Sequence, residues 1–105
     1  MTVSEPRKID IVAEDPGGKI VLAMCEPRQW GSSHRLEDEL KAKIHNYISF
    51  MRSDAYKKDY GDADASIMLI ASYEPPEEIK ELLERISYSE GIEIKLKIMP
   101  VRNIF

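Results

Sequence analysis

Apolar residues recur along this chain with two periods, and each period predicts one kind of element. Alternation, or short runs rich in β-branched residues, predicts strands over Ile9–Ala13, Lys19–Cys25, Ala65–Tyr73 and Ile92–Ile98. Apolar residues three and four positions apart predict two helices. The apolar stripe of the longer helix, which spans about four or five turns, consists of Leu36, Leu40, Ile44, Tyr47, Ile48 and Met51. The stripe of the shorter helix consists of Ile79, Leu82, Leu83 and Ile86.

Prolines, glycines and polar clusters separate these elements. Asp15-Pro16-Gly17-Gly18 predicts the reversal of a hairpin, and Gly31-Ser32-Ser33 predicts a loop with a serine N-cap. The polar segment Ser53–Asp64 predicts a connecting loop. Pro75-Pro76 suits the start of the second helix, and Gly91 suits its end.

The order of elements is therefore ββαβαβ, and we expect one domain over residues 1–105. Two strand–helix–strand crossovers in succession should both be right-handed, which puts both helices on the same face of the sheet. The second and third strands are apolar on both faces and belong in the middle. We therefore predict an α/β (α+β) two-layer sandwich with a mixed four-stranded sheet in the order 1-2-3-4 and an antiparallel first strand.

The pairing register of the hairpin decides which side chains share a face. A four-residue loop over Asp15–Gly18 would pair Glu14 with Lys19 and place Asp10 opposite Ala23. Glu26 lies three residues beyond Ala23, so it would point to the opposite face from Asp10. A slip of one residue would bring the two carboxylates to the same side.

The predicted sheet has an apolar strip on the face away from the helices. Such a strip on a small domain favours a partner surface, and we expect a homodimer or a contact with another protein. The alternative is that the tail Met99–Phe105 folds across the strip and covers it. The strip consists of Val12, Val21, Ala23, Cys25, Met68 and Ile70.

Composition narrows the function classes. The 15 basic and 19 acidic residues give a formal net charge of -4, and no Lys/Arg run is present, so we do not expect nucleic-acid binding. The single Cys25 cannot form an intrachain disulfide, which favours a reducing compartment. The start of the chain has no signal-peptide pattern, and no apolar run reaches the roughly 20 residues of a membrane span. A cytoplasmic protein is the expectation.

One constellation resembles the signature of metal-dependent nucleases of the restriction-endonuclease type. Asp10 on one strand, with Glu26 and Arg28 on the next, resembles their Asp…Glu-x-Lys pattern, in which two carboxylates hold a divalent metal. The predicted register separates Asp10 from Glu26, arginine replaces lysine, and Pro27 interrupts the strand. The alternative is that these residues form ordinary edge and strand-end charges.

Three motifs resemble a small bacterial family of single-domain proteins of unknown function. They are IDIVA at Ile9–Ala13, Glu26-Pro27-Arg28-Gln29-Trp30 and an L-x-x-K-I-x-N-Y helix. The helix motif consists of Leu40, Lys43, Ile44, Asn46 and Tyr47. The resemblance covers about the first half of the chain and implies a bacterial α/β protein without an assigned activity. The charged segment Ser53–Asp64 departs from it.

The same motifs suggest a polar site with an aromatic wall. Lys43, Asn46 and Tyr47 neighbour one another on a helix and could meet Glu26, Arg28 or Trp30 at the strand end. A small molecule could bind there, or Trp30 could simply cap the core. Tyr56 and Tyr60, in the polar segment, are the tyrosines we expect to face a ligand.

Metal and cofactor signals are weak. His34 and His45 lie eleven positions apart, about 16 Å along a helix, so they cannot share a metal ion. Asp59, Asp62 and Asp64 lack the spacing of a calcium loop. We therefore predict no metal, no cofactor and no catalytic residue. The leading hypothesis is a non-enzymatic interaction or accessory protein that self-associates, ahead of a nuclease-like enzyme and of small-molecule binding near Trp30.

Overall fold

The structure is a computed structural model that describes residues 11–31 and 34–100, except for the side chain of Ile11. In chain order its elements are β1 (Ile11–Glu14), β2 (Ile20–Glu26), α1 (Leu36–Met51), α2 (Asp54–Tyr60), β3 (Ala65–Ala71), α3 (Glu77–Glu90) and β4 (Ile94–Ile98). The strands form one sheet in the order β1-β2-β3-β4. β1 pairs antiparallel with β2, whereas the β2–β3 and β3–β4 pairs are parallel. The predicted α+β fold and strand order are confirmed.

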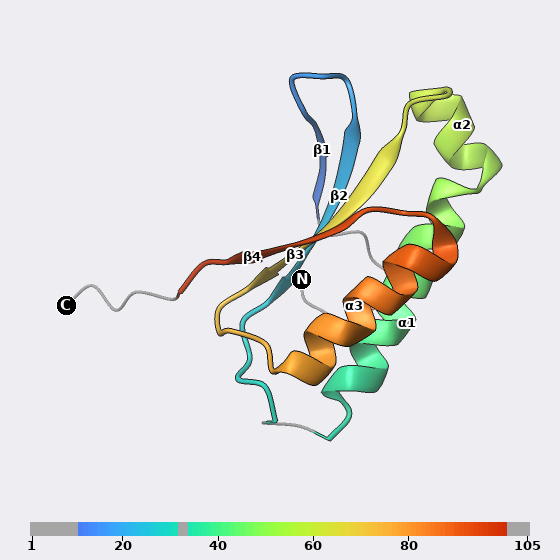
Figure 1. Ribbon diagram of the computed structural model, residues 1–105. Coiled ribbons are helices and arrows are strands. Elements are labelled where there is room, and N and C mark those ends of the chain that lie inside the picture. The colour runs from blue at the N-terminus through green and yellow to red at the C-terminus, as the bar shows by residue number, and fades with distance from the viewer. Residues whose placement is uncertain (1–10, 32–33, 101–105) are drawn as a thin grey trace.

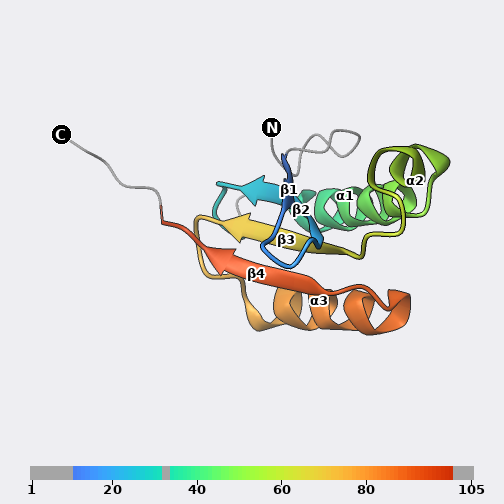
Figure 2. The same cartoon turned by 90° about the horizontal axis from the view of Figure 1, so that it is seen from above.

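The helices pack on one face of the sheet (Figures 1 and 2). A single buried cluster joins alternate residues of β2 and β3 to the apolar stripes of α1 and α3. Leu22, Leu40, Ile44, Ile67 and Leu69 are inaccessible to solvent in this layer. Burying such side chains contributes roughly 1.5–3 kcal/mol each. The core is therefore one apolar layer between sheet and helices, as two right-handed crossovers require.

The hairpin register differs from our prediction by one residue. Glu14 pairs with Ile20, Val12 with Leu22 and Ile11 with Ala23. The reason lies in Asp15, whose side-chain Oδ1 accepts hydrogen bonds from the backbone N–H groups of Gly17 and Lys19, both at 2.9 Å. Asp15 and Lys19 therefore form the last pair of the hairpin. The loop between them has three residues and ends at Gly18, whose φ is +83°.

The new register moves Val12 to the other face of the sheet. It lies opposite Leu22 and so shares the helix-covered side, where it is 39% exposed at the edge. Its predicted place in the outer strip was therefore wrong. Val21, Cys25, Met68 and Ile70 do lie half-buried on the outer face, while Ala23 is buried there. Of the predicted covering tail, residues 101–105 lie outside the described residues.

The segment predicted as a loop contains the short helix α2. Ser53 caps it, because its hydroxyl accepts from the backbone N–H of Tyr56 at 3.2 Å. Tyr56 is 4% exposed, packs edge-to-face on Phe50 at 5.7 Å and donates its hydroxyl proton to the carbonyl of Ala63. Burial raises the pKa of Tyr56. Tyr56 is thus a core residue, and its predicted ligand-facing role was wrong; Tyr60 also packs partly buried against the core.

The helix ends follow simple backbone chemistry. α1 begins after Arg35, which makes no side-chain cap; the predicted serine caps lie outside the described residues. α3 begins after Pro76 and ends at Gly91, whose φ of 67° lies in the left-handed region. Glu77 and Glu78 in the first turn of α3 complement the helix dipole.

Replacing Ser53 by alanine tests the cap of α2. We expect Ser53→Ala to lower the free energy of unfolding by about 1 kcal/mol, because the N–H of Tyr56 loses its acceptor. Urea denaturation would measure the change. The control is Ser49→Ala on the exposed side of α1. Equal stabilities of the two variants would contradict the cap.

Candidate functional site

The strand end that sequence reasoning singled out holds a bidentate ion pair. The carboxylate of Glu26 accepts from Arg28 Nε at 3.0 Å, from Arg28 NH2 at 2.7 Å and from the backbone N–H of Arg28 at 2.8 Å. The same NH2 group donates to Glu39 on α1 at 2.8 Å. Arg28 therefore ties the end of β2 to the first turns of α1.

Glu26, Arg28 and Glu39 form a buried triad, and their low exposure indicates a structural role. The Glu26 side chain is inaccessible to solvent, whereas Arg28 and Glu39 are 30% and 27% exposed. Hydrogen bonding to Glu26 raises the pKa of Arg28, partial burial opposes the rise, and Glu39 adds to it. The guanidinium therefore stays charged and neutralises a carboxylate that no water reaches.

The predicted helix residues separate from one another. Lys43 is fully buried, with its ammonium nitrogen 5.8 Å from the centroid of the Tyr47 ring. Tyr47 is also fully buried and donates its hydroxyl proton to the carbonyl of Ala23 at 3.0 Å. Asn46 faces solvent. No open polar site gathers these three side chains, because two of them belong to the packed layer.

The nuclease-like arrangement rested on Asp10, Glu26 and Arg28. Asp10 lies outside the described residues, and the observed register removes the reason for placing it on the opposite face from Glu26. The carboxylate of Glu26 is nevertheless occupied, since both oxygens accept hydrogen bonds from Arg28. Holding a metal there would require Arg28 to leave a buried carboxylate. Within 11–31 and 34–100, no group of three or more metal-ligating side chains is found.

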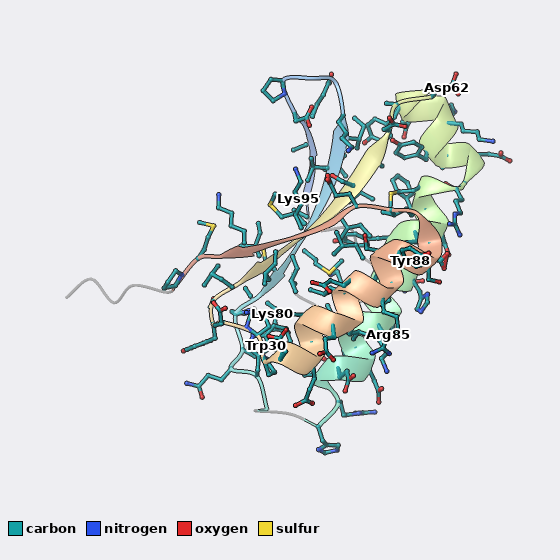
Figure 3. The ribbon with its side chains drawn as sticks, in the orientation of Figure 1. Trp30, Asp62, Lys80, Arg85, Tyr88 and Lys95 are labelled. Carbon is teal, nitrogen blue, oxygen red and sulfur yellow. The ribbon has the colours of Figure 1, made fainter. Side chains whose placement is uncertain are left out.

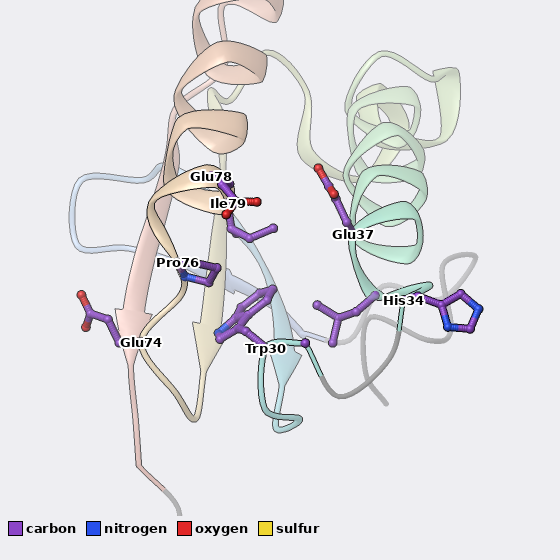
Figure 4. A pocket seen from close by; sticks show the side chains of 9 residues that line it. Trp30, His34, Glu37, Glu74, Pro76, Glu78 and Ile79 are labelled. Carbon is purple, nitrogen blue, oxygen red and sulfur yellow. The ribbon is translucent and has the colours of Figure 1, made fainter.

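Trp30 lies in a different place, at a cavity of about 530 Å³ between the N-terminal ends of α1 and α3 (Figure 4). Its indole N–H donates to the carbonyl of Tyr73 at 2.9 Å, which fixes the ring against the segment that leads into α3. The ring stands in the middle of the cleft, with Pro76 and Ile79 on one side. The volume falls in the range of small-ligand sites. The lining residues are Trp30, Gly31, His34, Leu36, Glu37, Glu74, Pro76, Glu78 and Ile79.

The charged side chains that line this cleft are acidic. Within 11–31 and 34–100, Glu37, Glu74 and Glu78 line it, and no lysine or arginine does. Glu37 on α1 and Glu78 on α3 lie on opposite sides of the cleft (Figure 4). Glu74 is neutralised by Lys80 at 2.6 Å and raises the pKa of that lysine by hydrogen bonding, whereas Lys41 approaches Glu37 only to 3.8 Å. Glu78 and the more weakly paired Glu37 thus line the cleft together with the ring of Trp30.

Sequence reasoning found Trp30 but missed these glutamates. A usable signal was present, because Glu37 and Glu78 occupy the first turns of helices that follow adjacent parallel strands. The carboxyl ends of such strands meet at one edge of the sheet, so residues just after them converge.

The profile of the Family of unknown function (DUF6572) matches residues 1–100. The chain belongs to this family. The match extends well beyond the first half of the chain, to which the motif resemblance was limited. It also includes α2, which lies in the charged segment Ser53–Asp64 that departs from the three motifs. The searches of curated proteins and of solved structures found no match. For this DUF6572 member, then, function has to be argued from the site.

Among the residues that the structure describes, no helix has the length and apolar character that crossing a bilayer demands.

Removing Arg28 tests the buried triad. We expect Arg28→Ala to lower the free energy of unfolding by about 3 kcal/mol, because the buried carboxylate of Glu26 loses its counter-charge. Chemical denaturation would measure the loss. Arg52→Ala, which removes an exposed arginine paired with Glu90 at 3.3 Å, is the matched control and should cost less than about 1 kcal/mol. Equal losses would contradict the structural role of Arg28.

Proposed function

We propose that the protein is a non-catalytic binding protein and that the Trp30 cleft receives a positively charged group of its ligand. The group is an ammonium or guanidinium, carried by a small amine or by a lysine or arginine side chain. The observation that carries the proposal is the lining of the cleft by Trp30 and three glutamates, with no lysine or arginine among the described residues that line it.

The chemistry of the lining favours a cation in two ways. Carboxylates at the rim create a negative potential that attracts cations and repels anions. The face of an indole attracts a cation within about 6 Å, with a gain of roughly 0.5–1 kcal/mol at exposed sites. The apolar floor of Leu36, Pro76 and Ile79 can receive the alkyl chain that carries the charge.

A charged and a neutral probe of the same shape test this proposal. We expect butylammonium to change the emission of Trp30, the chain's single tryptophan, in a saturable way. 1-Butanol should change it much less, because it lacks the charge. The double variant Glu37→Gln/Glu78→Gln should weaken butylammonium binding about tenfold, if each carboxylate contributes about 0.7 kcal/mol.

The control variant is Glu81→Gln/Glu84→Gln, which removes the same charge from exposed positions of α3 that do not line the cleft. It should bind butylammonium nearly as tightly as the wild type. Equal emission changes with butylammonium and butanol, or equal losses in both double variants, would contradict the proposal.

Self-association is a second candidate, favoured by the one-sided packing of the sheet. The helices cover one face, while Val21, Cys25, Met68 and Ile70 stay half-buried on the other. A second copy of the chain placed on this strip would remove apolar surface from water.

A charge at the centre of the strip tests the dimer. We expect the wild type to sediment as a dimer and Ile70→Lys to sediment as a folded monomer, because an ammonium cannot be buried against a second apolar strip. Circular dichroism would check the fold. The control is Glu81→Lys, which introduces the same side chain at an exposed position of α3, on the other side of the sheet. A wild type that sediments as a monomer would refute self-association.

A further inference from the structure

A second cavity lies farther along the same two helices, and an arginine is among the residues that line it. It measures about 130 Å³ and is lined by His45 of α1 and by Arg85, Ile86, Ser89 and Glu90 of α3. α1 and α3 run in the same direction on the same face of the sheet (Figure 1). Residues of both helices therefore line a cavity at their N-terminal ends and another nearer their C-terminal ends.

Arg85 dominates the charge of the second cavity. Its side chain is exposed and extends from α3 (Figure 3), and no ion pair is recorded for it within 11–31 and 34–100. The carboxylate of Glu90 is directed elsewhere, since it pairs with Arg52 at 3.3 Å. The hydroxyl of Ser89 and the imidazole of His45 add hydrogen-bonding groups. This end therefore suits a carboxylate.

The segment between the two cavities is compatible with a continuous contact. Lys41 lies one turn from both Glu37 and His45, and Leu82 lies one turn from both Glu78 and Ile86. Lys41 is partly exposed and Leu82 is buried. From the first cavity to the second, the charged lining residues thus change from glutamates alone to a set that includes Arg85.

We propose that the surface of α1 and α3 that includes both cavities binds a helical segment of a partner protein, which places a cation over Glu37 and Glu78 and a carboxylate over Arg85. The inference rests on the proposed cation site and extends it. The spacing of the charges suits a helix: Glu78 and Arg85 are about 11 Å apart along the helix axis, a separation that two turns of a partner helix reproduce.

The direction of the partner helix follows from electrostatics. Its cation lies at the N-terminal ends of α1 and α3, and its carboxylate lies toward their C-terminal ends. A helix is more stable with its carboxylate near its own N-terminus and its cation near its C-terminus. The partner helix therefore runs antiparallel to α1 and α3, with the acidic residue about seven positions before the basic one.

The probe is an alanine-rich helical peptide of about 18 residues that carries a glutamate and, about seven positions later, a lysine. Fluorescence anisotropy of the labelled peptide measures its affinity for the full chain. Replacing the glutamate of the peptide by glutamine should weaken binding about threefold to fivefold, as expected for one exposed ion pair. Arg85→Gln should have the same effect, and both changes together should weaken binding no further.

Two controls make the result specific. Lys58→Gln removes an exposed positive charge from α2 that lines neither cavity, and it should leave the affinity unchanged. Arg85→Glu should regain affinity for a peptide with lysine at both positions, because the charge pair is restored in reverse. A misfolded variant could not show this regain.

The outcomes separate this inference from the proposed function. Butylammonium binding at Trp30, together with equal affinities for the glutamate and glutamine peptides, would overturn the helical partner and leave the cation site standing. Failure of both butylammonium and the peptide to bind would overturn both. A peptide effect that Arg85→Gln does not change would refute the assignment of the carboxylate to Arg85.

Discussion

The parallel pairing of β2 with β3 is the constraint on which the rest of this structure depends. Their register runs from Ile20 opposite Ala65 to Glu26 opposite Ala71, so the two strands end together. Parallel strands need a crossover, and the right-handed crossovers put α1 and α3 on the same face. The N-terminal ends of both helices consequently lie at one edge of the sheet. The Trp30 cleft is the space between these two ends.

The buried triad fixes that edge. Glu26 is the last residue of β2, and Arg28 connects its carboxylate to Glu39 on α1. The turn between strand and helix is therefore held by charge-assisted hydrogen bonds in addition to apolar packing. Trp30 lies two residues farther along, with its N–H bound to the Tyr73 carbonyl on the segment after β3. Both segments that shape the cleft are thus anchored, which is what a preformed binding site requires.

Hydrophobic periodicity predicted most of the fold, because strand and helix stripes are strong signals in this chain. The span Leu36–Met51 of α1 and the order of the four strands follow from it. The hairpin register escaped prediction, since it depends on hydrogen bonds from backbone N–H groups to the Asp15 side chain. α2 escaped it because one capping serine and one buried tyrosine stabilise a helix whose other residues are mostly polar. Of the predicted site residues, Glu26 and Arg28 were placed at the end of the second strand, but their ion pair with one another was not predicted. The burial of Lys43 and the positions of Glu37 and Glu78 in the cleft were not predicted, because they depend on how the helices pack on the sheet.

The proposed function requires a cation to lie over the indole of Trp30. The most direct test is the measurement of intermolecular nuclear Overhauser effects between butylammonium and the protein. We predict cross-peaks from the alkyl protons to the Trp30 ring and to the methyl groups of Ile79, which line the same cleft. Cross-peaks to the outer face of the sheet alone, or none at ligand concentrations that saturate the emission change, would contradict the account.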